Sequence, residues 1–219
     1  MFTITIDGPS ASGKSTVADI VAKELNMHHL NSGDFYRAIA LYMLRKNIHF
    51  EDAEKIKKEL KNIKVTIKYI DDVQHDYLNG EDVTGLLHTN EINEVVSKFG
   101  HNLDVVEKAS NLTLLATETE NLVIDGRNVG SYVIPDADCK VFLDCDAKIR
   151  AERRYKEALE KGSKVSFEEI LKQTIERDEL DKKRVVAPLI VPKNARIVKS
   201  DNKTPEEVAQ EIIKIVQRM

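Results

Sequence analysis

The feature that most limits how this chain can fold is a glycine-rich segment near its start, where residues 8 to 15 read Gly-Pro-Ser-Ala-Ser-Gly-Lys-Ser. The segment matches the pattern G-x-x-x-x-G-K-[ST] in full, directly after the apolar run 2–6 and directly before a helical pattern. Such a loop surrounds triphosphate oxygens with backbone N–H groups, and the following helix presents the positive end of its dipole to the same point. The sequence therefore predicts an α/β P-loop protein that binds a nucleoside triphosphate.

Each residue type in this loop has an expected task. Gly8 and Gly13 leave room for the backbone, Lys14 reaches the β and γ phosphates, and the Ser15 hydroxyl is the expected metal ligand, for Mg²⁺. The predicted nucleotide-binding residues form one continuous stretch: Gly8, Pro9, Ser10, Ala11, Ser12, Gly13, Lys14, Ser15 and Thr16.

Composition narrows the class of protein. A chain of 219 residues with 42% hydrophobic content suits one core with small insertions. The net charge of -4 and the pI of about 5.9 argue against nucleic-acid and membrane partners, because both need an excess of positive surface charge. Cys139 and Cys145 lack ligand spacing and are expected to be buried thiols of a reducing compartment. No leader or long apolar segment stands out, so a cytoplasmic monomer is the expectation.

Apolar runs alternate with helical patterns along the chain, which is typical of a parallel sheet covered by helices on both faces. A capping box at Thr204, with Pro205 at the first helical position and Glu207 at the third, predicts where the last helix begins. The expected strands are residues 2–6, 28–30, 122–125, 140–143 and 195–198.

Two stretches depart from this alternation and are interpreted as insertions. Residues 61–87 predict a β-hairpin outside the sheet, with strands at 65–70 and 74–78 between turn-forming pairs. Residues 146–184 predict a highly charged pair of helices, the second of which is capped by Ser166.

Arginine residues recur at places that a triphosphate alone does not explain. Because guanidinium groups bind phosphate oxygens bidentately, several of them indicate a second phosphate-bearing substrate. Arg177, Asp181 and Arg184 are expected on one helix face, which either clamps a phosphate or is an ordinary ion-paired face. The other candidates are Arg37, Arg127, Arg153 and Arg154.

Several segments, in this order and at matching intervals, resemble the bacterial cytidylate kinases. The resemblance implies a P-loop nucleoside monophosphate kinase with a three-layer core made of residues 1–31, 119–145 and 185–219. Residues 32–118 would be an acceptor-binding insertion that contains the hairpin, and residues 146–184 a helical lid. The segments are residues 7–16, Ser32-Gly33-Asp34-Phe35-Tyr36-Arg37-Ala38, residues 78–84, Asp125-Gly126-Arg127, residues 135–138, and residues 177–184 with Ala187-Pro188-Leu189.

The same resemblance implies roles for single residues. Arg37, Arg127, Arg177 and Arg184 would hold the acceptor phosphate, with Asp181 and Arg177 also at its ribose. Arg153 would reach the donor from the lid, so the implied catalytic set is Lys14, Arg127, Arg153 and Arg184. The implied acceptor-binding set is Ser32, Tyr36, Arg37, Ser97, Arg127, Asn128, Arg177, Asp181 and Arg184.

The chain departs from the family where the base would be recognised. Asn128 stands in place of an Asp, and Val106 in place of an Arg. An Asp carboxylate only accepts hydrogen bonds, whereas an Asn amide can offer either a donor or an acceptor. Relaxed selection of cytosine over uracil is therefore expected.

The expected activity is transfer of the γ-phosphoryl group from Mg·ATP to CMP or dCMP. The sequence leaves two alternatives open. One is a P-loop kinase of another nucleoside monophosphate or of a small hydroxyl metabolite, which would need a base such as Asp34 or Asp125. The other is an ATP-binding regulatory protein without efficient transfer. Asp125 itself either orders water around Mg²⁺ or caps a turn.

Overall fold

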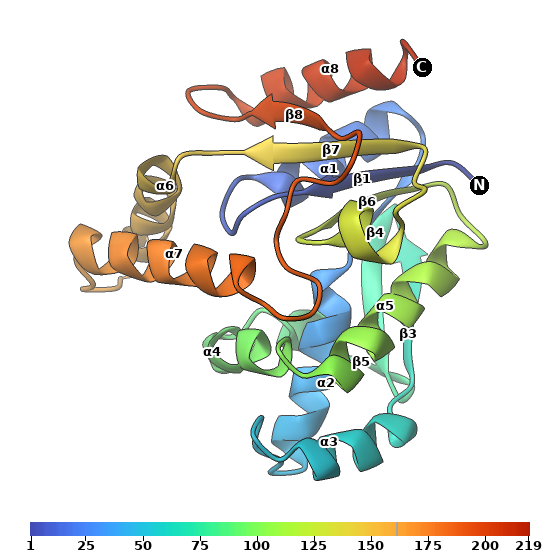
Figure 1. The fold of residues 1–219 in the computed structure, drawn as a ribbon, viewed down its shortest axis with the longest axis vertical. Coiled ribbons are helices and arrows are strands. Elements are labelled where there is room, and N and C mark those ends of the chain that lie inside the picture. Colours follow the sequence, from blue (N-terminus) through green and yellow to red (C-terminus); the bar gives the residue numbers. More distant parts are fainter. Residues whose placement is uncertain (161) are drawn as a thin grey trace.

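The centre of the computed structural model, which describes residues 1–160 and 162–219, is a parallel sheet of five strands (Figure 1). The strands lie in the order β2-β6-β1-β7-β8, so the chain crosses over between neighbours, as a doubly covered parallel sheet requires. The predicted α/β fold is confirmed. The strands are β1 (Thr3–Asp7), β2 (His28–Asn31), β6 (Leu122–Gly126), β7 (Cys139–Asp144) and β8 (Arg196–Lys199).

The helices begin largely where local signals place them. Lys14 opens the first helix directly after the glycine-rich loop, and Thr204 caps the last one with both bonds of the predicted capping box. Ser166 accepts the backbone N–H of Glu169, so it caps the second charged helix, as its capping-box pattern with Glu169 predicted. The helices are α1 (Lys14–Glu24), α2 (Gly33–Arg45), α3 (Ala53–Glu59), α4 (Asn90–Phe99), α5 (Leu103–Thr117), α6 (Ala147–Glu160), α7 (Phe167–Lys182) and α8 (Pro205–Val216).

Strand β6 supplies two hydrophobic cores, because successive side chains of a strand point to opposite faces. Val123 joins the core that α1 and α8 cover. Leu122 and Ile124 join the core on the other face, which continues into α2, α5 and the hairpin. The second of these cores therefore spans the sheet and the segment inserted between β2 and β6.

The expected hairpin strands form a small second sheet. β3 (Val65–Ile70) and β4 (Val73–Leu78) pair antiparallel, with Val65 opposite Leu78, and the short β5 (Glu81–Asp82) adds to β4. Asp71 and Asp72 make the two-residue turn with φ of 50° and 62°, which is the left-handed pair that such hairpins favour.

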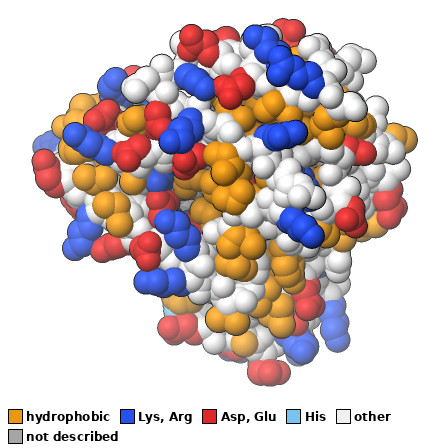
Figure 2. Space-filling view, turned by 45° about the horizontal axis from the view of Figure 1, so that its top comes forward, with side chains coloured by type: hydrophobic (Ala, Val, Ile, Leu, Met, Phe, Trp, Pro, Cys, Tyr) orange, Lys and Arg blue, Asp and Glu red, His pale blue; other side chains and the backbone are white. Residues whose placement is uncertain are grey.

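The charged helices α6 and α7 follow β7 and project together from one end of the sheet (Figure 1). Residue 161, inside the expected lid, lies outside the described residues. Among the helices that are described, none is both long and apolar enough to cross a membrane. On the face drawn in Figure 2, acidic and basic side chains are interspersed around exposed apolar ones.

Candidate active site

The glycine-rich loop connects β1 to α1 at the carboxyl end of the sheet. A Cβ at Gly8 would lie 2.3 Å from the carbonyl oxygen of Leu143, so only glycine allows the loop to pass this close to β7. Gly13 has a φ of 91°, in the left-handed region that glycine adopts without strain. Ala11 also has a left-handed φ, of 59°. Gly8 is therefore required by the close approach of β7, and Gly13 by its backbone conformation.

Lys14 is almost fully buried beneath the loop. Its Nζ donates to the carbonyl oxygen of Pro9 at 2.7 Å and lies 3.4 Å from the hydroxyl of Ser12. Burial, followed by the charge of Arg127, lowers the pKa of Lys14 well below its ordinary value. A cation that is destabilised in this way is stabilised by any anion that enters the loop.

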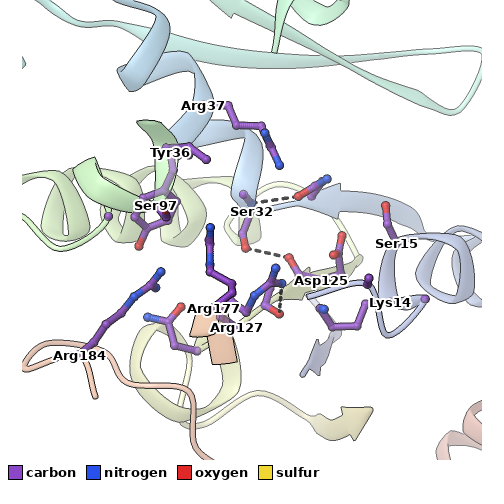
Figure 3. Close-up of a pocket in the computed structure, with 18 of the residues that line it drawn as sticks. Lys14, Ser15, Ser32, Tyr36, Arg37, Ser97, Asp125, Arg127, Arg177 and Arg184 are labelled. Carbon is purple, nitrogen blue, oxygen red and sulfur yellow. Dashed lines mark hydrogen bonds between the residues drawn. The ribbon is translucent and has the colours of Figure 1, made fainter. Parts of the chain in front are cut away.

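A pocket of about 290 Å³ opens beside the loop, and we call it the central pocket. Figure 3 shows Lys14 and Ser15 on one side of it and the side chains of Ser97, Arg177 and Arg184 on the other. The structure thus brings most of the predicted donor and acceptor residues to one cavity. Its lining includes Ala11, Gly13, Lys14, Ser15, Thr16, Ser32, Tyr36, Arg37, Ser97, Asp125, Arg127, Asn128, Arg177 and Arg184.

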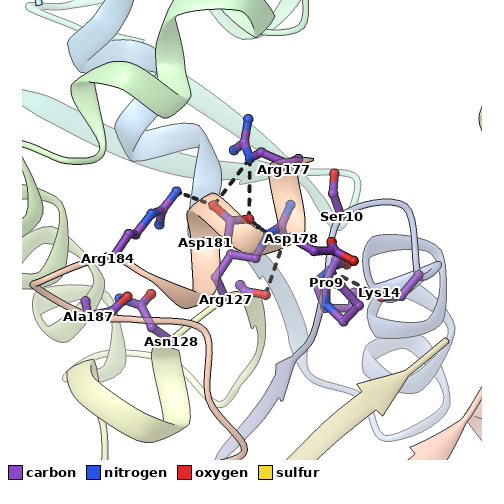
Figure 4. Close-up of polar contacts among 12 residues, drawn as sticks. Pro9, Ser10, Lys14, Arg127, Asn128, Arg177, Asp178, Asp181, Arg184 and Ala187 are labelled. Atoms are coloured by element: carbon purple, nitrogen blue, oxygen red, sulfur yellow. Dashed lines mark hydrogen bonds and ion pairs between the residues drawn. The ribbon is translucent and has the colours of Figure 1, made fainter. Parts of the chain in front are cut away.

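Asp181 holds three of the arginines together (Figure 4). Its carboxylate lies 2.6 Å from Arg184 Nη2, 3.3 Å from Arg177 Nε and 3.4 Å from Arg127 Nε, and its side chain is 1% exposed. Burial alone would raise the pKa of Asp181, but the three guanidinium charges outweigh it and hold this pKa below its ordinary value. The mutual repulsion of the arginines is therefore offset inside the protein.

One detail of the predicted arginine face is wrong. Arg177 and Asp181 do lie one turn apart on α7, but that helix ends at Lys182, before Arg184. Leu189 N–H donates to the carbonyl oxygen of Asp181, so the chain turns back over the helix end. Arg184 reaches the Asp181 carboxylate from this turn rather than from the helix.

Arg37 approaches the central pocket from the first turns of α2. It donates to the side-chain oxygen of Asn93 at 2.5 Å and to the carbonyl oxygen of Leu87 at 3.3 Å. Its Nε lies 3.4 Å from Asp34. These contacts orient the guanidinium group by bonds to α2, to α4 and to the segment that leads into α4.

Asp125, at the end of β6, is bonded from two sides. Its carbonyl oxygen accepts both the N–H and the hydroxyl of Ser32, at 3.1 and 2.8 Å. Its carboxylate lies 2.8 Å from His29 Nε2. No local pattern in the sequence predicts this histidine contact, because the two residues are 96 positions apart.

Two of the side chains that line the central pocket, Asn128 and Tyr36, are polar and uncharged. Asn128 is buried and its amide donates to the carbonyl oxygen of Ala187 at 3.4 Å. Burial raises the pKa of Tyr36 to about 12, so its hydroxyl stays protonated. Val106 is buried within α5.

Helix α6 touches the glycine-rich loop through two arginines, of which only Arg153 was expected. Arg153 donates to the carbonyl oxygens of Ser12 and Ser200, at 3.2 and 2.9 Å, and is not among the residues that line the central pocket. Arg150 is 2% exposed, donates to the carbonyl oxygen of Ser10 at 3.0 Å, and forms a buried ion pair with Asp178 of α7. These bonds join α6 directly to the loop, and α7 to it through Arg150.

The residues present suit a magnesium ion that arrives with the nucleotide. Ser15 offers an exposed hydroxyl at the start of α1, and Asp125 offers a buried carboxylate in the same pocket, both of them the oxygen ligands that Mg²⁺ prefers. Within the described part of the chain, no three His, Cys, Asp or Glu side chains are grouped to hold a metal by themselves.

A parallel five-stranded sheet, a phosphate loop after its first strand and an arginine-lined pocket beside that loop define a P-loop phosphotransferase. The structure of a shikimate kinase from Bacteroides thetaiotaomicron covers 99% of this chain and 98% of its own, with a TM-score of 0.52 and 15% identity, and so shares the fold.

Sequence comparison narrows the class. The family model "Cytidylate kinase" matches residues 4–218, and the chain belongs to the cytidylate kinase family. A cytidylate kinase of Thermotoga maritima is 40% identical over 220 residues, which cover 99% of this chain and 97% of the relative. One of Fusobacterium nucleatum is 39% identical over 218 residues, with the same coverage.

Proposed function

We propose that this protein transfers the γ-phosphoryl group of Mg·ATP to CMP or dCMP and releases ADP with CDP or dCDP. The observation that carries the proposal is the arrangement of Arg37, Arg127, Arg177 and Arg184 around the same pocket as Lys14. Membership of the cytidylate kinase family supports the choice of acceptor. A protein that only bound ATP would have no use for this second cationic wall.

The acceptor phosphate needs no general base, because its second pKa of about 6 leaves it a dianion at neutral pH. The protein must bring two anions together and stabilise charge on the group in transfer. Lys14 serves the donor side, and Arg127 and Arg184 the acceptor side. Arg177 and Arg37 hold the acceptor phosphate in line, and Asp181 keeps three of the four guanidinium groups on a common centre.

The nucleotide would be seated by Ser32, Tyr36, Ser97 and Asn128, which line the rest of the pocket. Bound Mg²⁺, held by Ser15 and the donor phosphates, would supply further positive charge at the bridging oxygens. Asp125 would order water around it. The carboxylate of Asp125 already lies against His29, and that of Asp34 against His88 and Arg37, so neither resembles a free base for a hydroxyl acceptor.

Residues 146–184 would act as a lid and residues 32–118 as the acceptor-binding insertion. Closure of the lid over both substrates excludes water, to which the γ-phosphoryl group would otherwise be lost. Arg150 and Arg153 support this role, since they bond the lid helix α6 to the loop that holds the donor.

The test is ADP release from Mg·ATP in the presence of CMP, dCMP, UMP, AMP or shikimate in parallel. Stimulation by CMP and dCMP is expected, with some by UMP, because the neutral amide of Asn128 discriminates weakly between the two pyrimidines. Stimulation by shikimate alone would indicate a metabolite kinase. ADP release that no acceptor changes would indicate a regulatory protein.

A further inference from the structure

Asp7, the last residue of β1, is fully buried directly before the phosphate loop and has no part in the chemistry described above. Each of its carboxylate oxygens accepts a backbone N–H: Oδ1 from Val129 at 2.8 Å and Oδ2 from Gly130 at 2.7 Å. These two N–H groups belong to η3 (Val129–Val133), the π-helical turn that follows Arg127 and Asn128.

The β-ladder does not fix this connection. The register of β1 with β6 ends at the pair Asp7 and Gly126, so Arg127 and Asn128 lie beyond the last paired residue. The two bonds to Asp7 are made immediately after them in the chain. Arg127 and Asn128 are thus held on one side by the end of the β1–β6 pairing and on the other by the Asp7 carboxylate.

The fit around this contact is close. A Cβ on Gly130 would lie 2.5 Å from Thr5 Oγ1 and 3.3 Å from Asp7 Oδ2, so a side chain at this position would push η3 away from β1. Thr5 Oγ1 is buried and makes no hydrogen bond among the described residues. The contact between the strand and the turn therefore depends on the absence of a side chain.

A buried carboxylate in this place is unfavourable by itself. Burial raises the pKa of Asp7 to about 6, although the N–H groups of Val129 and Gly130 and the charges of Lys14 and Arg127 favour its ionised form. The two hydrogen bonds that the Asp7 carboxylate accepts come from backbone N–H groups and not from a charged side chain. Its position between the phosphate loop and the residues of the acceptor wall suggests a task in the reaction.

We propose that Asp7 is a positioning residue that sets the location of Arg127 and Asn128 relative to the phosphate loop. It acts through the backbone of η3, and it touches neither substrate. The inference rests on the proposed function, because it concerns the alignment of donor and acceptor. Displacement of a reacting group by about 1 Å can reduce a rate by roughly 100-fold.

The first test is Asp7→Asn, which keeps the size of the side chain but turns an NH2 group toward one of the two N–H donors. We expect kcat/KM for CMP to fall by about 10- to 100-fold, while the dissociation constant of Mg·ATP, measured by calorimetry, changes by less than about 3-fold. The control is Asp138→Asn. Asp138 accepts the N–H of Thr3 at 2.7 Å at the far end of the same strand, and its substitution should leave both values unchanged.

The second test does not remove the carboxylate. Gly130→Ala should reduce kcat/KM for CMP, Thr5→Ala alone should not, and the double variant should recover part of the loss because the nearest obstructing atom is gone. Recovery in the double variant would show that the placement of η3, rather than general stability, limits the rate.

Two results would overturn the inference. One is an Asp7→Asn enzyme with normal kcat/KM for CMP. The other is a parallel loss of CMP turnover and Mg·ATP affinity that follows a lower melting temperature, which would make Asp7 only structural. If the unsubstituted protein does not turn over CMP, the proposed function and this inference both fail. That outcome is distinguished from failure of the inference alone because it is observed without any variant.

Discussion

The proposed donor and acceptor sides of the central pocket are built in opposite ways. The donor side is one continuous stretch, residues 8–16, and its geometry comes mainly from the backbone. The acceptor side takes Arg37 from α2, Arg127 from directly after β6, Arg177 from α7 and Arg184 from the turn beyond it. The donor side thus needs little beyond its own sequence, whereas the acceptor side exists only in the folded chain.

Removal of the single cation of the donor loop should have the largest effect. Lys14→Ala is expected to lower kcat by about 1,000-fold, because the lost charge acts on the group in transfer. The melting temperature should change little, because the substitution also removes a cation that burial destabilises. Steady-state kinetics and thermal melting measure the two effects. Lys23→Ala, at an exposed residue of the same helix, should behave as the unsubstituted protein. A similar loss of kcat there would show that the effect does not depend on the charge at the loop.

Asp7, which lies where the two sides meet, should make the free energy of unfolding depend on pH. Because the pKa of Asp7 is raised to about 6 in the folded protein, that state holds its proton more tightly than the unfolded chain. Asp7 should therefore make the protein less stable as pH rises from 4 to 6, by up to about 3 kcal/mol, with no further change above.

The measurement for Asp7 is denaturant unfolding of the unsubstituted protein and of Asp7→Asn at each pH. Asp76 has a pKa raised to about 6 as well, and its contribution cancels in the difference between the two proteins. A difference that does not vary with pH would mean that Asp7 is not the titrating group.

The acceptor side should depend on the carboxylate that gathers its arginines. Asp181→Asn leaves three neighbouring guanidinium groups without a counter-charge, and kcat/KM for CMP should fall by about 100-fold while KM for ATP changes little. Glu179→Gln removes an exposed carboxylate from the same helix and is the control. Equal effects on both substrates would argue that the two sides are not built separately.

A single arginine of the acceptor side should matter less. Arg37→Lys keeps the charge but loses the planar fork, so KM for CMP should rise by about 10-fold with kcat nearly unchanged. Arg45, on the same helix as Arg37, forms an exposed ion pair with Glu81, and Arg45→Lys should have no effect on kinetics. A fall in kcat without a change in KM would place Arg37 in the transition state instead.

The smallest effect is expected within the loop backbone. Ala11 adopts a left-handed φ that glycine adopts more easily, so Ala11→Gly should change stability by less than about 1 kcal/mol and leave activity intact. Thermal melting and initial rates are sufficient to check this. A large loss of ATP affinity would show that the methyl group itself contacts the nucleotide.

What could be predicted from the sequence follows the same division. The strands, the loop glycines and the Thr204 capping box depend on residues next to one another, and each was found where expected. The arginines that would form an acceptor site were found by their number and by a family resemblance. Their common centre on Asp181 became visible only in the fold, since Arg127 lies far from α7 in the chain.

The contacts that the sequence did not reveal join distant residues. His29 and Asp125 are 96 positions apart, Arg150 and Asp178 are 28 apart, and Asp7 and Val129 are 122 apart. No periodicity or cap links such pairs, because their distance is set by the packing of the sheet or, for Arg150 and Asp178, by that of α6 against α7. The end of α7 before Arg184 was missed for a related reason. No glycine or proline stops that helix, and the chain instead turns back so that Leu189 N–H donates to the carbonyl oxygen of Asp181.

Because β6 contributes side chains to both cores, the sheet and the inserted segment are expected to unfold together. Leu122 and Ile124 pack with α2 and α5, so unfolding of the inserted segment would expose the floor of the sheet to water. Calorimetry should accordingly record one endotherm for the whole chain. A fragment of residues 32–118 made alone would lack the apolar surface of β6 that completes its core.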